Sequence, residues 1–384
     1  MIKSFYASTC EIDDAQAAVA EIKAALDLEK NLLKNSLGII SCFSEFAETG
    51  VLQEICGALP FDCVGATSCL CSAGGKTDQI IFTITVLTSD DCSFKTTAVP
   101  IDGNYKNSVA SAISGLLEGA GEHPKLFLSY FPMISAVSGD MILTEIDGAS
   151  GGVPLFGTVS VDHTMDYSTA QTILNGTAYL EAAVLCAVYG NPEFSFEIAS
   201  LDENKVSKQK AIITASDGNI LMGVNGMNAM DYLEEIGLSR AELARGLGII
   251  PLVVDHKDGT RPVARGVFGL TPEGYAVCGG SMPTGTTLAI GRIDMNDVLS
   301  TTEKTLAPFI ENDKDSFVLG YSCMSRYLSL GANSTAEAEK VAEITGGLPY
   351  HFACSGGEIC PHPDKDGRLR NFFHNHTIVF CKLK

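Results

Sequence analysis

The sequence has no tryptophan, no long apolar run and few basic residues. Its 384 residues include 26 Lys and Arg against 46 Asp and Glu, a formal net charge of −20. A surface this acidic repels phosphate backbones and anionic lipid head groups, so we expect neither nucleic acid nor a membrane surface as a partner. No segment reaches the roughly 18 consecutive apolar residues of a transmembrane helix, since the longest candidate, 247–254, contains Gly and Pro. We therefore expect a protein that does not span membranes.

Secretory-signal and paired-cysteine patterns are also missing. The first fourteen residues contain one Lys and then turn acidic, whereas a secretory signal places a basic region before an apolar one. The 13 cysteines are odd in number, and several lie in apolar strand or helix patterns, where a reduced thiol packs as a small hydrophobe. These features predict a cytoplasmic protein without a disulfide framework.

The residues that are abundant suit a folded α/β protein. Hydrophobic residues make up 46% of the chain and charged residues 19%, and there are 38 glycines. A chain of this length exceeds what one hydrophobic core usually supports, so we expect at least two domains. The polar, charged segment 201–209 lacks apolar periodicity and marks the expected boundary, which gives domains of residues 1–205 and 206–384.

Three stretches of the chain follow one plan. Each has an apolar strand, a short helix, a Gly-containing turn that ends in Pro, a second strand and, after a polar loop, a third strand. The turns are GALP (57–60), GGVP (151–154) and GGLP (346–349). Around them we predict strand 37–43, helix 50–58 and strand 80–87 in the first copy, strand 126–131, helix 137–147 and strand 178–189 in the second, and strand 316–322, helix 335–345 and strand 377–383 in the third. In the third copy Ser334 and Glu337 have the spacing of a capping box, and Gly346 ends the helix.

This repeat predicts the fold class. In a strand–helix–strand crossover the two strands lie parallel, and a strand that follows closely pairs antiparallel, which gives mixed sheets. Amphipathic helices at 19–26 and 109–117 are expected to cover them. Between the second and third copies we expect a hairpin around 217–219, helices near 228–246 and a helix near 294–311. The prediction is an α/β fold of repeated β-α-β-β units, with mixed sheets and covering helices arranged in two lobes.

Polar residues suited to ligand binding gather in three segments of the third copy. These segments are SCMSR (322–326), CSGGEIC (354–360) and NFFHNHT (371–377). In α/β folds ligands bind beyond the carboxyl ends of parallel strands, which is where such loops lie. An isolated Arg or a Gly-rich turn is often purely structural. The occurrence of all three segments in one copy nevertheless favours a binding site.

A metal site is an alternative for the same region. His374 and His376 share one face of a strand, and Cys360 with His362 can complete a tetrahedral set. Against this, there is no C-x2-C pair. We predict no metal and keep this set as the alternative.

Three motifs, spread over nearly the whole chain, resemble the FIST family, whose name refers to F-box and intracellular signal transduction proteins. VGATSCLCSAGG (64–75) is similar to the Gly-, Cys- and Ser/Thr-rich segment of its N-terminal domain. YSCMSRYLSLG (321–331) is similar to a CxxR segment of the C-terminal domain, and residues 354–377 resemble its closing GEIGP and FHNxT signature. The resemblance implies a two-part sensory module that binds small molecules, with amino acids or their derivatives the usual proposal. It also implies fusion to signalling outputs in many members and an association with haem in some.

The resemblance assigns the binding role to particular residues. They are Cys323, Arg326, Ser355, Gly356, Gly357, Glu358, His374 and Asn375, with Thr67 and Ser68 in the matching loop of the N-terminal lobe. The chain shows no output domain, so we expect either a free-standing sensor or one that acts by contacting a separate signalling protein. LCSAGGKT (70–77) departs from the Gly-Glu of the family, which puts a second, N-terminal pocket in doubt.

The leading hypothesis is a small-ligand sensor in which Arg326 holds a carboxylate, Glu358 holds an amine and the backbone of 356–357 completes the cradle. Loss of either side chain is expected to weaken binding by about 2–3 kcal/mol.

Two other functions stay open. An acyl transferase or hydrolase would use Cys323 as nucleophile and His374 as base, with the Gly loop donating to an oxyanion. A haem-binding gas sensor, suggested only by the resemblance, would ligate iron through His163, His256 or His374. We otherwise expect no cofactor.

Overall fold

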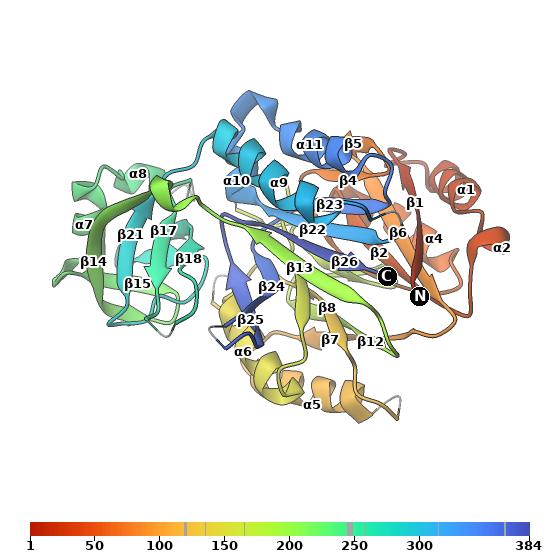
Figure 1. Cartoon of the computed structure of the whole chain (residues 1–384), viewed down its shortest axis with the longest axis horizontal. Coiled ribbons are helices and arrows are strands. Elements are labelled where there is room, and N and C mark those ends of the chain that lie inside the picture. The colour runs from red at the N-terminus through yellow and green to blue at the C-terminus, as the bar shows by residue number, and fades with distance from the viewer. Residues whose placement is uncertain are drawn as a thin grey trace.

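The computed structural model describes residues 1–118, 121–134, 136–164, 166–243, 249–257, 259–313, 315–364 and 366–384. These residues form two lobes of unequal size (Figure 1). The larger lobe holds three six-stranded sheets with helices on their outer faces, and the smaller lobe, residues 206–291, is a curled sheet beside it. The predicted fold class, an α/β fold with mixed sheets, covering helices and two lobes, is confirmed.

The larger lobe contains three units with the common order strand, helix, strand, helix, strand, hairpin, strand. The first unit comprises β1 (Lys3–Thr9), α1 (Ala15–Leu26), α2 (Leu28–Asn31), β2 (Asn35–Cys42), α3 (Glu45–Glu48), α4 (Val51–Gly57), β3 (Asp62–Thr67), β4 (Cys71–Ala73), β5 (Lys76–Asp78) and β6 (Phe82–Ser89). The second comprises β7 (Ser93–Pro100), α5 (Tyr105–Glu118), β8 (Leu126–Phe131), α6 (Gly139–Ser150), β9 (Leu155–Val159), β10 (Thr172–Leu174), β11 (Thr177–Tyr179) and β12 (Ala182–Tyr189). The third comprises β13 (Phe194–Ala199), α9 (Met295–Phe309), β22 (Phe317–Cys323), α10 (Met324–Ser329), α11 (Ala336–Thr345), β23 (Tyr350–Ser355), β24 (Glu358–Pro363), β25 (Leu369–His374) and β26 (Ile378–Leu383). Short 3-10 turns lie at Glu203–Lys205 and Gly331–Asn333.

Strand pairing within each unit follows the predicted plan. The strands on either side of the second helical segment are parallel, namely β2 with β3, β8 with β9 and β22 with β23. The last strand of each unit pairs antiparallel with the first of these two. The crossover rule therefore predicts these mixed sheets correctly from local pattern alone.

The hairpins, in contrast, are exchanged between units. The hairpin β4–β5 of the first unit joins β23 of the third, β10–β11 of the second joins β3 of the first, and β24–β25 of the third joins β9 of the second. Each unit thus covers a sheet edge of another in a closed cycle, which leaves fewer unpaired edge strands. The exchange ties the three units into one lobe.

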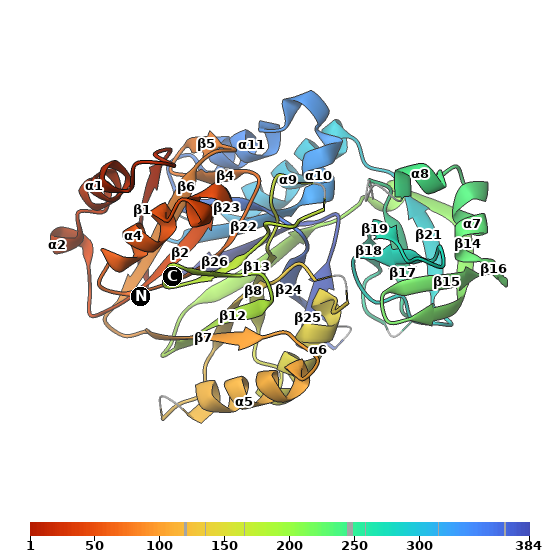
Figure 2. The same ribbon diagram turned by 180° about the vertical axis from the view of Figure 1, so that it is seen from behind.

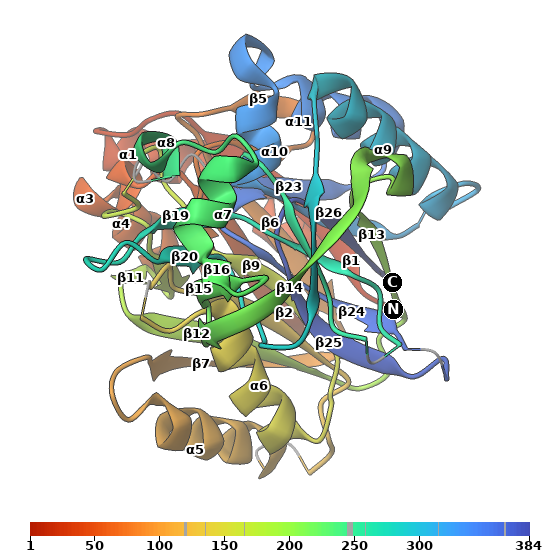
Figure 3. The ribbon, with the colours of Figure 1, turned by 90° about the vertical axis from the view of Figure 1, so that its left-hand side faces the viewer.

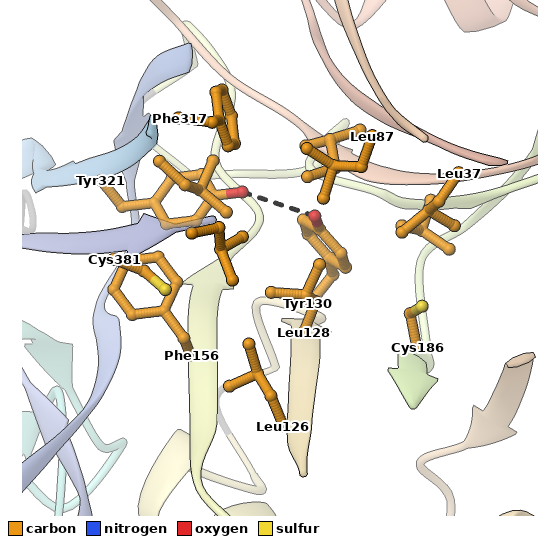
Figure 4. Packing of buried hydrophobic residues seen from close by; sticks show 14 of the residues in the cluster. Leu37, Leu87, Leu126, Leu128, Tyr130, Phe156, Cys186, Phe317, Tyr321 and Cys381 are labelled. Carbon is orange, nitrogen blue, oxygen red and sulfur yellow. Dashed lines mark hydrogen bonds between the residues drawn. The ribbon is translucent and has the colours of Figure 1, made fainter. Parts of the chain in front are cut away.

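The core of the larger lobe lies where the inner faces of the three sheets meet. Figure 4 shows apolar side chains from all three units packed together there. The Tyr321 hydroxyl donates to the Tyr130 hydroxyl at 3.5 Å, the one polar contact drawn in this view. Helices cover the outer faces on three sides of the lobe, as Figures 1 and 2 show. Sheets buried on both faces explain why the strands read as continuous apolar runs.

The smaller lobe is inserted into the third unit, between β13 and α9. Its elements are β14 (Val206–Asp217), β15 (Ile220–Val224), β16 (Met227–Asn228), α7 (Ala229–Glu235), α8 (Arg240–Leu243), β17 (Leu252–Asp255), β18 (Val263–Arg265), β19 (Val267–Leu270), β20 (Ala276–Cys278) and β21 (Thr287–Gly291). The sheet order runs from β18 to β19, and these two strands are separated in the chain only by Gly266, so the sheet curls round on itself. Figure 3 views this lobe from the side of α7 and α8. The predicted hairpin is present, with Gly218 at φ 55°. Of the helices predicted near 228–246, α7 and α8 are present, and residues 244–246 lie outside the described residues.

The two lobes are joined by an ion pair between the buried Arg265 and the partly buried Asp140. Arg265 of the smaller lobe donates from Nη2 to Asp140 Oδ2 at 3.0 Å and from Nη1 to the Phe373 carbonyl at 2.9 Å. The backbone N–H of Ser281 donates to the same Asp140 oxygen at 2.6 Å. The smaller lobe therefore packs on α6 and on the end of β25.

Candidate functional site

The three polar segments of the third unit converge at the junction between the lobes. Cys323 at the end of β22 lies opposite Ser355 at the end of β23, and Glu358 lies opposite His374 across β24 and β25. The backbone N–H of Cys323 donates to the Thr377 carbonyl at 2.9 Å. As predicted for this fold, the segments meet beyond the carboxyl ends of parallel strands.

Arg326 is wholly buried, and its guanidinium is engaged inside the larger lobe. Its Nη2 and Nε lie 2.6 and 3.0 Å from Glu337 Oε1, and the same group donates to the Val298 carbonyl at 2.9 Å. Hydroxyls of Thr301 and Thr302 accept further hydrogen bonds from it. This arrangement holds α9, α10 and α11 together, so a ligand carboxylate would have to compete with Glu337 for Arg326.

The start of α11 differs from the prediction because Glu337 pairs with Arg326 instead of capping the helix. The helix begins after Thr335 with no side-chain capping hydrogen bond, so the predicted capping box of Ser334 and Glu337 is wrong. The Glu337 carboxylate instead accepts from Arg326 and from the Ser322 hydroxyl. A buried cation is a stronger partner for a carboxylate than a helix N–H group.

Glu358 is fully buried, and only one of its two carboxyl oxygens has a hydrogen-bonding partner among the described residues. Its Oε2 accepts from the Thr377 hydroxyl at 2.6 Å, while Oε1 has no hydrogen-bonding partner among the described residues. Burial raises the pKa of the Glu358 carboxyl to about 8, against the hydrogen bond from Thr377, which lowers it. At neutral pH the group is mainly the uncharged acid.

Asn375 and His376 add four more polar atoms that lack partners. Both atoms of the Asn375 amide and both ring nitrogens of His376 are buried without a hydrogen bond among the described residues. His376 has φ 58°, and burial, with the charge of Arg326, lowers the pKa of its ring to about 3. Asn375 faces the smaller lobe, because a Cβ added at Gly279 would lie 2.5 Å from its Oδ1. Buried polar groups are almost always paired, so this cluster marks a place where a further partner fits.

The Gly-rich turn serves the fold more than the ligand. The N–H of Gly356 donates to the Val159 carbonyl at 3.0 Å, and that of Gly357 to Ser355 Oγ at 3.1 Å. A Cβ at Gly357 would lie 2.3 Å from the Phe373 ring. These two glycines therefore permit close packing, and their backbone donors are already used within the protein.

The matching residues of the first unit are also internally bonded. Thr67 exchanges hydrogen bonds with Gln171, and the Ser68 hydroxyl contacts the carbonyls of Leu70 and Cys354 at 2.9 and 3.0 Å. Both side chains are buried. The structure thus brings Thr67 and Ser68 to the junction between units, apart from the cleft described next.

A cleft of about 570 Å³ opens beside this cluster, between the lobes. His374 and Thr377 line it from the larger lobe, Arg261 lines it from the smaller lobe, and Lys304 of α9 stands at one side. The His374 ring contacts the Cys360 carbonyl through Nε2 at 3.3 Å, and burial, followed by the charge of Arg265, lowers its pKa to about 3. Sequence reasoning missed Arg261, because an exposed Arg in a loop has no local signal that distinguishes it.

Cys323 lacks the features of a nucleophile. Its thiol is buried, and burial, reinforced by Glu358, raises its pKa to about 12. Reactive thiols require the opposite shift. The described residues contain no hydrogen bond between Cys323 and His374, whose ring bonds to Cys360 instead.

We accordingly expect Cys323 to react slowly with iodoacetamide at neutral pH. The exposed Cys10 is the internal reference, because a thiol that solvent reaches should be labelled first. Labelling rates of the two peptides can be compared by mass spectrometry, with denatured protein showing that both are detectable. Faster labelling of Cys323 than of Cys10 would restore the enzyme hypothesis.

The alternative metal and haem ligands are not gathered into one site. Within the described ranges, no group of three or more His, Cys, Asp or Glu is placed to hold a metal ion. The alternative set of His374, His376, Cys360 and His362 is therefore not assembled into such a group. The rings of His163 and Phe43 pack together with 4.6 Å between their centroids, and His256 interacts with other groups of the protein.

None of the helices in the described part of the chain combines the length and apolar character that a membrane crossing requires.

Comparison with models of known protein families identifies the family of this chain. A model of the FIST N domain matches residues 36–227, and a model of the FIST C domain matches residues 229–361. The chain belongs to the FIST family. FIST domains are sensory domains that bind small ligands in signal transduction, so the resemblance seen in the motifs is confirmed. The two models divide the chain inside the smaller lobe, and the division at residues 205 and 206 stays a prediction.

Other comparisons add little to this FIST assignment. No curated protein matches the chain. Among solved structures, cyanuric acid hydrolase from A. caulinodans is similar over 99% of this chain and 98% of that chain, with a TM-score of 0.40 and 9% sequence identity. Similarity at this level is too low to transfer any property of that enzyme.

Proposed function

We propose that this FIST protein is a cytoplasmic sensor that binds an amino acid or a similar small polar metabolite in the cleft between its lobes. The observation that carries the proposal is the unpaired buried oxygen of Glu358, whose hydrogen-bonding partner Thr377 lines that cleft. The unpaired atoms of Asn375 and His376 lie next to Thr377 in the chain and do not themselves line the cleft. A cleft at a domain junction, with a few polar groups converging on it, is the usual form of a small-ligand site. Burying such groups without partners costs free energy that a ligand can recover.

Glu358 is the group suited to a ligand amine. Its hydroxyl partner Thr377 lines the cleft, and its free oxygen has no partner among the described residues. An ammonium group that reached this carboxyl would favour its ionised form and make a charge-assisted hydrogen bond. The proposed role of Glu358 is therefore the one expected from the sequence, which is to hold the amine of the ligand.

Arg261 replaces Arg326 in the proposal as the partner of a ligand carboxylate. Arg326 is buried against Glu337, whereas Arg261 lies at the wall of the cleft on the smaller lobe. Lys304 lines the same cleft, but its charge is offset by Asp202, which lies 3.5 Å from it and also lines the cleft. A ligand held by Thr377 and Glu358 on one side and Arg261 on the other would contact both lobes.

We expect Arg261→Ala to weaken binding of an amino-acid ligand by roughly 10- to 100-fold, since hydrogen bonds to charged groups contribute about 1.5–3 kcal/mol. A thermal-shift screen of amino acids and organic acids finds the ligand, and calorimetry then measures its Kd with each variant. Arg240→Ala is the matched control, because Arg240 lies on the same lobe and pairs with Glu234 at the surface. If Arg261→Ala and Thr377→Val both bind the hit as tightly as the parent protein, this cleft is not the site.

Contact with both lobes also suggests how binding is signalled. The lobes are joined by the short connections around 200–205 and 292–294, so a bound ligand would bias how the smaller lobe sits on the larger one. We propose that a separate output protein reads this difference.

A further inference from the structure

A second cavity, of about 520 Å³, lies at the lobe junction on the other side of β25. Its wall is mainly apolar and comes from both lobes: Met133, Ile134, Val137 and Phe373 from the larger lobe, and Phe268 and Leu270 from the smaller one. No Lys or Arg lines it among the described residues, and the carboxylate that does, Asp166, is exposed. Such a wall suits an uncharged ligand, because a charged group would lose its hydration there without finding a counter-ion.

One polar group in this wall lacks a partner. Ser138 is 6% exposed, and its hydroxyl makes no hydrogen bond among the described residues. It is the N-cap of α6, a position where a serine hydroxyl normally accepts from the first turn of the helix, yet no such bond is formed. Ser138 lines the cavity, and its buried hydroxyl bonds neither to the helix nor to any other group among the described residues.

We propose that this cavity binds an uncharged, mainly apolar small molecule whose single hydrogen-bonding group pairs with the Ser138 hydroxyl. Apolar rings would replace water against Met133, Phe268 and Phe373, and burial of that area is the driving force. The proposal is independent of the amino-acid cleft, since the two cavities lie on opposite faces of β25, which presents Phe373 to one and His374 to the other. A molecule bound here touches both lobes and would stabilise their association.

Indole and 1-methylindole are suitable probes, because they share a ring and differ in one N–H donor. The chain has no tryptophan, so indole fluorescence excited beyond the tyrosine absorption reports only the ligand. We expect both probes to bind the full chain, and Ser138→Ala to weaken indole by roughly 3- to 10-fold while leaving 1-methylindole unchanged. Equal weakening of both probes would show that the Ser138 hydroxyl makes no bond to the ligand.

The location is tested by filling the cavity. Val277 and Leu270 both line it, and Val277→Phe and Leu270→Phe are expected to weaken both probes by more than about 10-fold. Val206→Phe is the matched control, because Val206 lines the amino-acid cleft instead and should leave indole binding intact. Circular dichroism confirms that each variant is folded. The proposal is overturned if the parent protein binds neither probe, or if both filled variants bind indole as the parent does.

Discussion

Replacing Glu337 by alanine should destabilise the protein by roughly 3–5 kcal/mol, because it leaves the Arg326 guanidinium buried without a counter-charge. Arg326 is fully buried, and Glu337 lies 2.6 Å from it with further hydrogen bonds from Thr302 and Ser322. A loss of this size is a large share of the stability of an ordinary domain. Urea unfolding followed by circular dichroism measures it.

The matched control lies on the same helix. Glu343 pairs with Lys340 at the exposed face of α11, so Glu343→Ala should leave the unfolding midpoint nearly unchanged. A double variant, Arg326→Met with Glu337→Met, removes both charges, keeps apolar volume and should regain much of the lost stability. If Glu337→Ala is no more harmful than Glu343→Ala, the ion pair does not hold these helices together.

Replacing Glu358 by glutamine should remove the loss of stability that this carboxyl causes as the pH rises from about 4.5 to about 8. The ordinary pKa of this carboxyl is 4.5, and burial raises it to about 8 in the folded protein. Between these values the unfolded chain releases the proton while the folded chain keeps it, so the free energy of unfolding falls as pH increases. A shift of one pKa unit corresponds to about 1.4 kcal/mol, and Glu358→Gln is expected to be more stable than the parent by on the order of 3 kcal/mol near pH 9.

Below about pH 4.5 the two profiles should run parallel, because Glu358 is protonated there in both the folded and the unfolded chain. Burial lowers the pKa of His351, His374 and His376 from 6.5 to about 3. These rings stay neutral in the folded protein and take up protons when it unfolds, so stability falls as the pH drops below about 6.5 in both proteins. Urea midpoints across the pH range test both limbs, with Glu339→Gln on the exposed part of α11 as control. An alkaline limb that is identical in Glu358→Gln and the parent would mean that Glu358 is ionised in the folded state.

Local pattern was enough to predict the repeated unit. Segments 126–131 and 317–322 lie in strands as predicted, because a mainly apolar run of this length has few other ways to be buried. Gly346 ends α11 at φ 58°, as its place before the turn predicted. The exchange of hairpins between units was not predictable, because each hairpin pairs with a strand far away in the sequence and carries no local mark of which one.

The candidate site shows the same division. The polar segments 354–360 and 371–377 were found because their residue types are unusual at strand ends, and the structure does bring them together. The pairing of Arg326 with Glu337 depends on how α10 packs against α11, and neither residue has a local feature that shows it. Arg261 and Ser138 are candidate ligand contacts only because each of them lines a cavity of the folded protein.

The sequence by itself determined the family, the three strand–helix–strand units and the strongly negative net charge, because these depend on composition and on short-range periodicity. Only the tertiary structure decided which charges are neutralised inside the protein and which face a cleft. The physical reason is that burial and pairing of a side chain are set by neighbours that arrive from distant parts of the chain.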